Sequence, residues 1–124
     1  MSRILVVDDD PLQLDLYKQV LEFAGYDVEI AFTTRQALSS VKQGSADLII
    51  LDLRFPDAKG VPDAREGVGL IRHIRETGCR TPMIVLSGWP EDLAGRPEER
   101  MVSRVLLKPV RTPVLLHTAL DLLS

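Results

Sequence analysis

The sequence alternates between short apolar runs and longer amphipathic segments, and each apolar run ends in polar residues. The first run, ILVV, leads directly into three consecutive aspartates. The apolar runs at residues 4–7, 48–51, 83–86 and 105–107 are predicted to form buried strands. Continuously apolar strands are typical of parallel sheets that are buried on both faces. The pattern therefore predicts an α/β fold, a doubly wound parallel sheet with helices on both sides.

The remaining segments give the order of elements. Strands are expected at residues 3–8, 26–31, 46–52, 81–87 and 103–108. Helical periodicity predicts helices over 11–24, 34–41, 67–77 and 89–100, and from 112 onward. Asp10 and Pro11 fit the cap and first residue of the first helix, and Thr34 fits the cap of the second. The helix at 89–100 has few apolar residues, and residues 54–66 are expected to form a loop.

Composition limits the class of protein. The chain has 124 residues, which suits one domain spanning 1–124, and 45% of them are hydrophobic. A formal net charge of −3 gives no electrostatic reason to bind nucleic acid. No apolar run is long enough to cross a membrane, and the first residues lack the apolar core of a signal peptide. The single cysteine, Cys79, has no internal disulfide partner, so a cytoplasmic location is expected.

Five polar residues follow directly after apolar strands. Ligands bind beyond the carboxyl ends of the strands in open parallel sheets. These ends are therefore expected to bring together Asp8, Asp9, Asp52, Ser87 and Lys108. Clustered carboxylates repel one another unless a cation lies among them, and Mg²⁺ suits oxygen ligands that leave water positions open. Asp10 is expected to cap the first helix and not to join this cluster.

The same residues suit phosphoryl transfer. A magnesium site with open positions can bind phosphoryl oxygens, to which Lys108 adds a second cation and Ser87 a hydroxyl donor. Asp52 stands alone on its strand, so its carboxylate can act as a nucleophile and become an aspartyl phosphate.

Four motifs, ILVVDDDP, DLIILDL, MIVLSG and VLLKP, in this order and spacing resemble the receiver domain of two-component response regulators. The resemblance covers essentially the whole chain. It implies a flavodoxin-like, three-layer αβα fold with strand order 2-1-3-4-5, and Asp52 as the phosphoacceptor. It also implies that Mg²⁺ is bound directly by Asp9 and Asp52, through water by Asp8, and by the backbone carbonyl of Arg54. The implied partner is a sensor histidine kinase or a histidine phosphotransfer protein, and a homodimer is possible.

The resemblance also assigns roles near the phosphoryl group and exposes two departures. Ser87 and Lys108 take the switch hydroxyl and phosphoryl-binding positions, Trp89 a tuning position, and Lys108–Pro109 a cis peptide. Val105 stands where the family usually has an aromatic residue whose movement reports phosphorylation. The segment RFPDAKGVPDAREG is several residues longer than the usual loop. We therefore expect residues 54–66, and not a ring at position 105, to respond to phosphorylation.

Three other functions are compatible with parts of the sequence. Asp8 and Asp10 have the spacing of an aspartate-nucleophile phosphatase of the haloacid-dehalogenase type, but Asp52 would then have no role. A flavin-binding module on the same fold would need a Ser/Thr/Gly-rich phosphate loop where three aspartates stand. A receiver used only for docking would not need the complete set of acceptor, metal, hydroxyl and lysine residues. The chain is therefore expected not to be an enzyme in the usual sense.

Overall fold

The main sheet is parallel and has the expected strand order. The computed structural model describes residues 2–124. Its five-stranded sheet runs β2-β1-β3-β6-β7, which is the order 2-1-3-4-5 when only these strands are numbered. The strands are β1 (Arg3–Val7), β2 (Asp27–Ala31), β3 (Leu48–Asp52), β6 (Met83–Ser87) and β7 (Arg104–Leu107). The doubly wound, flavodoxin-like α/β fold is confirmed.

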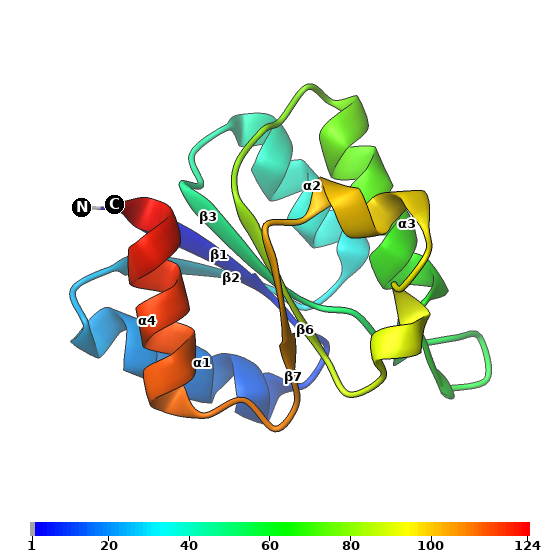
Figure 1. The fold of residues 1–124 in the computed structure, drawn as a ribbon, viewed down its shortest axis with the longest axis horizontal. Helices are drawn as coiled ribbons and strands as arrows, with labels where there is room; N and C mark the ends of the chain where they lie inside the picture. The colour runs from blue at the N-terminus through cyan, green and yellow to red at the C-terminus, as the bar shows by residue number, and fades with distance from the viewer. Residues whose placement is uncertain (1) are drawn as a thin grey trace.

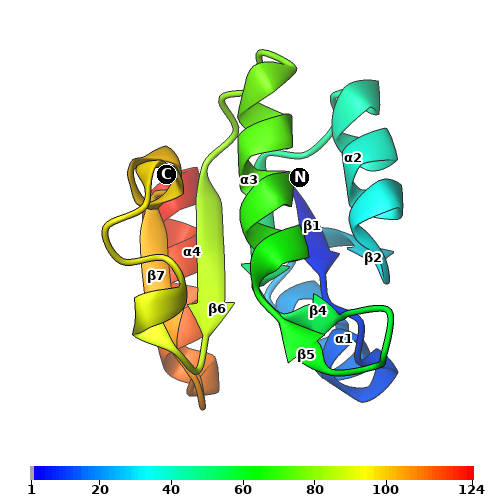
Figure 2. The same ribbon diagram turned by 90° about the vertical axis from the view of Figure 1, so that its right-hand side faces the viewer.

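Four helices cover the two faces of this sheet (Figures 1 and 2). One face carries α1 (Pro11–Phe23) and α4 (Thr112–Leu123), and the other carries α2 (Thr34–Gln43) and α3 (Arg65–Glu76). Because side chains alternate along a strand, each inner strand contributes to both layers. In β3, Ile49 and Leu51 pack toward α2 and α3, while Leu48 and Ile50 pack toward α1 and α4.

The segment after β6 differs from the prediction of a helix at 89–100. It forms two short 3₁₀ helices, η1 (Pro90–Asp92) and η2 (Pro97–Met101), separated by a turn. Gly95 in that turn has a φ of +79°, and Pro97 lacks the amide hydrogen that a continuous helix would use. Only Leu93 and Glu98 in the segment 89–100 are buried, so this segment lacks the apolar face that stabilises an amphipathic helix.

The long segment after β3 contains structure that the sequence did not predict. Residues 55–63 form a hairpin of β4 (Phe55–Pro56) and β5 (Pro62–Asp63), and α3 begins at Arg65 rather than at residue 67. The Asp57 side chain accepts hydrogen bonds from the Lys59 and Val61 amides and so closes the hairpin turn.

Several smaller differences concern helix ends and faces. Thr33, not Thr34, caps α2, because its hydroxyl accepts a hydrogen bond from the Gln36 amide. Leu12 and Leu16 are exposed on α1, whose buried face consists of Leu14, Tyr17 and Leu21. The cis Lys108–Pro109 bond is confirmed. None of the described helices has both the length and the apolar character needed to cross a membrane.

Candidate functional site

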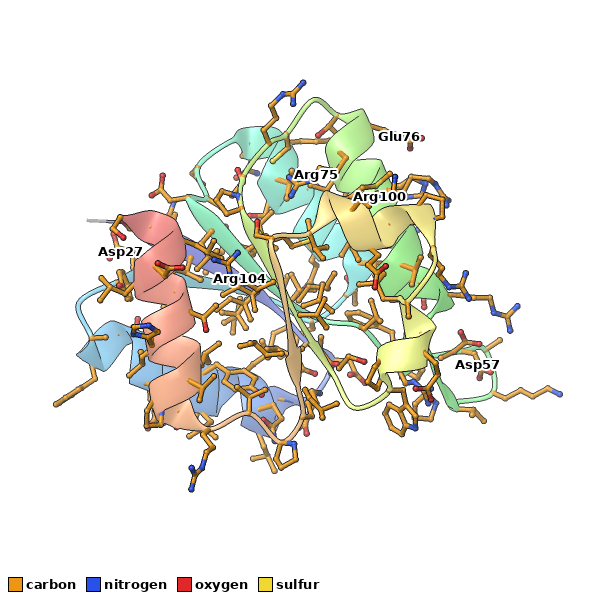
Figure 3. All side chains as sticks on the ribbon, viewed as in Figure 1. Asp27, Asp57, Arg75, Glu76, Arg100 and Arg104 are labelled. Atoms are coloured by element: carbon orange, nitrogen blue, oxygen red, sulfur yellow. The ribbon has the colours of Figure 1, made fainter. Side chains whose placement is uncertain are left out.

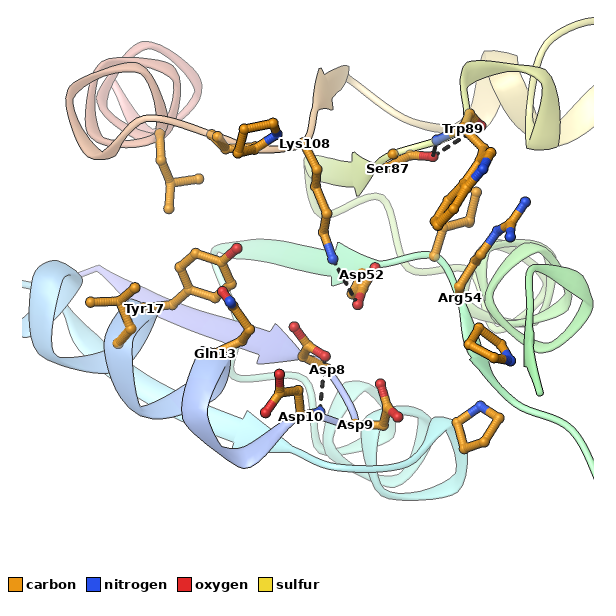
Figure 4. A pocket seen from close by; sticks show the side chains of 18 of the residues that line it. Asp8, Asp9, Asp10, Gln13, Tyr17, Asp52, Arg54, Ser87, Trp89 and Lys108 are labelled. Atoms are coloured by element: carbon orange, nitrogen blue, oxygen red, sulfur yellow. Dashed lines mark hydrogen bonds and ion pairs between the residues drawn. The ribbon is translucent and has the colours of Figure 1, made fainter. Parts of the chain in front are cut away.

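The expected polar residues do meet at the carboxyl end of the sheet. A cleft of about 730 Å³ opens there between the ends of β1, β3, β6 and β7 (Figure 4). All five predicted residues line it, namely Asp8, Asp9, Asp52, Ser87 and Lys108. The site arises because β1, β3 and β6 are buried and parallel, so the polar residues that follow them emerge on the same rim.

Asp8 is the most buried of the acids. Its side chain is 1% exposed, its Oδ1 accepts a hydrogen bond from the Asp10 amide at 3.0 Å, and its buried Oδ2 has no partner within the described part of the chain. Burial, reinforced by the nearby Asp52 carboxylate, raises the pKa of Asp8 to about 7. An orphaned carboxylate oxygen of this kind is stabilised by a cation placed within reach.

The acids have the arrangement of a magnesium site. Carboxylate oxygens of Asp8, Asp9 and Asp52 all lie within 4.8 Å of one another. Three carboxylates on one rim, one of them buried, match the preference of Mg²⁺ for a few carboxylates with water at the other positions. Asp10 stands apart from this cluster, because its side chain accepts a hydrogen bond from the Leu12 amide as the cap of α1.

Lys108 lies on the opposite side of Asp52. Its Nζ is 3.0 Å from Asp52 Oδ2, and the Asp52 side chain is only 12% exposed. The Asp52 carboxylate therefore lies between a lysine ammonium and two further carboxylates (Figure 4). A carboxylate between a lysine ammonium and a candidate cation position suits phosphoryl transfer, because positioning and charge neutralisation dominate that reaction.

Ser87 is buried at the end of β6, but its hydroxyl is already bonded. The hydroxyl donates to the Trp89 carbonyl at 3.0 Å and accepts from the Trp89 amide at the same distance. Ser87 is thus near Asp52 in the cleft but turned toward its own loop. In this conformation it donates no hydrogen bond to the Asp52 carboxylate.

The side chain of Arg54 belongs to the site as well, although only its backbone was singled out from the sequence. Its guanidinium donates two hydrogen bonds to Asp92, of 2.7 and 3.0 Å, and lies 3.6 Å from the centroid of the Trp89 ring. The Asp92 hydrogen bond holds the pKa of Arg54 above its ordinary value. Nothing in the sequence pairs positions 54 and 92, because the pair depends on how residues 88–96 turn.

Two further residues of α1 face the cleft. Gln13 and Tyr17 lie one helical turn apart and line its wall, and Figure 4 shows both side chains directed toward the Asp52 side. Burial, together with the negative charges of Asp8 and Asp52, raises the pKa of Tyr17 to about 12. Val105 does not line the cleft; it lies on β7 with 43% of its surface exposed.

Comparisons with solved structures agree with this fold and site. TrrA, a response regulator of Thermotoga maritima solved in complex with Mg²⁺ and beryllofluoride, is 26% identical and superposes with a TM-score of 0.83, over 98% of this chain and 99% of TrrA. A CheY-like receiver domain protein of Methanospirillum hungatei is 30% identical, with a TM-score of 0.81 over 99% of this chain and 94% of that one.

Curated sequences point the same way. The transcriptional regulatory protein TrcR of Mycobacterium tuberculosis is 32% identical over 85 residues, which are 68% of this chain and 30% of TrcR. The DNA-binding response regulator MtrA of Mycolicibacterium smegmatis is 31% identical over 111 residues, 84% of this chain and 49% of MtrA. The matches thus span about a third to a half of these relatives. Residues 4–120 match the sequence model of the response regulator receiver domain, and the chain therefore belongs to the response regulator receiver domain family.

Proposed function

We propose that Asp52 is the phosphoacceptor of this receiver domain and that it takes the phosphoryl group from a phosphohistidine. The observation that carries the proposal is the position of its carboxylate, 3.0 Å from Lys108 Nζ and within 4.8 Å of the oxygens of Asp8 and Asp9. The donor would be a sensor histidine kinase or a histidine phosphotransfer protein, and the reaction would take place in the cytoplasm.

In this mechanism a carboxylate oxygen of Asp52 attacks the phosphorus atom of the phosphohistidine. A new O–P bond forms, the P–N bond breaks, and its electron pair returns to the imidazole nitrogen. Lys108 exchanges part of its contact with Asp52 for a phosphoryl oxygen and so remains paired. Asp8, Asp9, Asp52 and the Arg54 backbone carbonyl would hold Mg²⁺, which when bound neutralises charge on the phosphoryl oxygens.

Ser87 would donate a hydrogen bond to the phosphoryl group once its hydroxyl leaves Trp89. The resulting change in the loop after β6 would alter contacts with other proteins, including a second copy of the chain. The phosphatase of the haloacid-dehalogenase type is less well supported, because Asp10, its second acid, is occupied as the cap of α1.

The proposal is tested by exposing the purified protein to acetyl phosphate and Mg²⁺ and measuring its intact mass. One added phosphoryl group is expected in the wild type and none in Asp52→Asn or without Mg²⁺. Asp27→Asn is the matched control, because Asp27 is an exposed aspartate on the edge strand β2 (Figure 3). Equal labelling of Asp52→Asn and the wild type would refute the assignment.

A further inference from the structure

We propose that Arg54, Trp89 and Asp92 form a lock that holds the Ser87 hydroxyl in its resting position and so opposes phosphorylation of the site. We call these three residues the Arg54–Trp89–Asp92 stack. In this arrangement Asp92 is a positioning residue that acts on Ser87 through the other two. The inference rests on the proposed function, because it concerns the step in which Ser87 turns toward the phosphoryl group.

The first part of the stack is a two-pronged ion pair between two segments of the chain. Arg54 follows β3 by two residues, and Asp92 ends η1. Nε and Nη2 of Arg54 each donate to one oxygen of Asp92, at 2.7 and 3.0 Å, with the two side chains 26% and 13% exposed. Such a fork fixes orientation as well as distance. The loop after β3 and the loop after β6 are therefore tied together beside the proposed phosphoacceptor.

The second part is the contact between Arg54 and Trp89. The guanidinium carbon lies 3.6 Å from the centroid of the indole ring, within the range of a cation–π contact. Trp89 remains 46% exposed, so the core does not enclose its ring, and the contact with Arg54 is one interaction that restrains it. Asp92 orients the guanidinium over the ring, and the ring in turn restricts the backbone of Trp89.

The third part connects the Trp89 backbone to the switch hydroxyl. Ser87 Oγ donates to the Trp89 carbonyl and accepts from the Trp89 amide, both at 3.0 Å. A serine hydroxyl has one proton to donate, so Ser87 cannot donate to a phosphoryl oxygen while it donates to Trp89. Ser87 must therefore release residue 89, and the stack resists that release by holding the same residue from its other side.

Because its contacts are present only in the resting state, the stack stabilises the resting protein relative to the activated protein. A contact present only in the resting state reduces the affinity for any ligand that favours the activated state. A partly exposed ion pair of good geometry corresponds to roughly a three- to tenfold change in an equilibrium constant. Weakening the stack should therefore increase the affinity for a phosphoryl mimic by that factor.

The test uses the full chain with Mg²⁺ and beryllofluoride as the probe. Binding is measured by calorimetry and by the fluorescence of Trp89, the only tryptophan in the sequence. Asp92→Asn keeps the shape of the side chain but removes its charge. We expect it to bind beryllofluoride about three- to tenfold more tightly than the wild type, and to change the resting fluorescence.

Two comparisons separate this role from a merely structural one. Asp121→Asn is the matched control, because Asp121 pairs with Arg104 at 3.0 Å and neither residue lines the cleft (Figure 3 labels Arg104). It should leave the affinity unchanged. In a Ser87→Ala background there is no hydroxyl to release, so adding Asp92→Asn should no longer tighten binding.

Unchanged or weaker beryllofluoride binding by a folded Asp92→Asn, or an equal gain in the Ser87→Ala background, would overturn the lock. If Asp92→Asn does not fold, Trp89→Leu tests the same step by calorimetry, because it removes the ring and keeps an apolar side chain; tighter binding is again expected. Failure of the wild type itself to bind Mg²⁺ and beryllofluoride would instead overturn the proposed function.

Discussion

The two sides of the cleft differ in whether their polar groups have hydrogen-bond partners. On the side of β1, the carboxylate of Asp8 is buried, and one of its oxygens has no hydrogen-bond partner among residues 2–124. On the side of β6, the polar groups already have partners, because Ser87 is bonded to Trp89 and Arg54 to Asp92. The acidic side thus has an unsatisfied buried group, whereas the side of Ser87 is satisfied and would have to lose contacts in the proposed function.

This difference should make binding of a cation and binding of a phosphoryl group affect the protein differently. A cation on the acidic side relieves a penalty that the fold already carries, so metal binding and stability should increase together. A phosphoryl group on the other side must replace existing hydrogen bonds, so part of its interaction energy is consumed by opening them. Removing the buried charge of Asp8 should therefore raise stability, whereas removing a hydrogen-bond partner on the side of Ser87 should lower it. The following predictions start from the largest effect.

Removing the charge of Asp8 should stabilise the metal-free protein. Asp8→Asn keeps the oxygen that accepts the Asp10 amide but removes the buried charge. Because one pKa unit corresponds to about 1.4 kcal/mol, we expect a gain of about 2 to 4 kcal/mol in the free energy of unfolding at pH 8. Chemical denaturation in the presence of EDTA measures it.

The sign of the pH dependence follows from the raised pKa. Asp8 has a pKa of about 7 in the folded protein and an ordinary value of 3.8, so the folded state binds more protons between these values. Stability of the wild type relative to Asp8→Asn should therefore fall as pH rises from 4 to 7 and stay level above. Asp10→Asn is the control, because asparagine caps helices equally well. A pH-independent difference would show that the Asp8 charge carries no penalty.

The acidic side also depends on one close backbone contact. A Cβ atom at Gly67 of α3 would lie 2.0 Å from the carbonyl oxygen of Leu53, the residue after Asp52. Gly67→Ala should therefore move α3 or residue 53 and cost about 2 to 3 kcal/mol of stability. It should also weaken Mg²⁺ binding, because the proposed Arg54 carbonyl ligand is the next residue.

Gly69→Ala is the matched control for this substitution. Gly69 lies in the same helix, but a Cβ atom there meets nothing within 4 Å. We expect a gain of up to about 1 kcal/mol, since alanine favours a helix over glycine. Thermal unfolding of both variants gives the comparison, and equal effects would show that the contact with Leu53 is not tight.

The difference between strand ends and loops explains which parts of the site could be predicted from the sequence. Asp8, Asp52 and Ser87 follow buried parallel strands, and the topology of such a sheet places them on one rim whatever the loops do. The partners of Arg54 could not be found in this way, because they depend on the conformation of residues 88–96. There Pro90 and Pro97 interrupt a pattern that resembles a helix, and the chain forms 3₁₀ turns instead.

The smallest expected effect concerns Val105, where most receivers carry an aromatic ring. Val105 pairs with Val85 in the register of β6 and β7, and 43% of its surface is exposed. Its branched side chain is stiff at χ1 and has no ring to exchange between exposed and buried positions. The coupling from Ser87 should therefore pass mainly through Trp89 and the Arg54–Trp89–Asp92 stack.

We expect Val105→Ala to change the affinity for Mg²⁺ and beryllofluoride less than about twofold, well below the effect of Asp92→Asn. Hydrogen exchange of the free and activated wild type should change most between residues 54 and 66, because Arg54 joins that segment to the stack. Strong protection confined to residues 90–110 with residues 54–66 unchanged would contradict this expectation, and a large effect of Val105→Ala would show that β7 contributes to the switch. The side of Ser87 would then be coupled through the sheet, and the ion pair of Arg54 with Asp92 would only stabilise the loop.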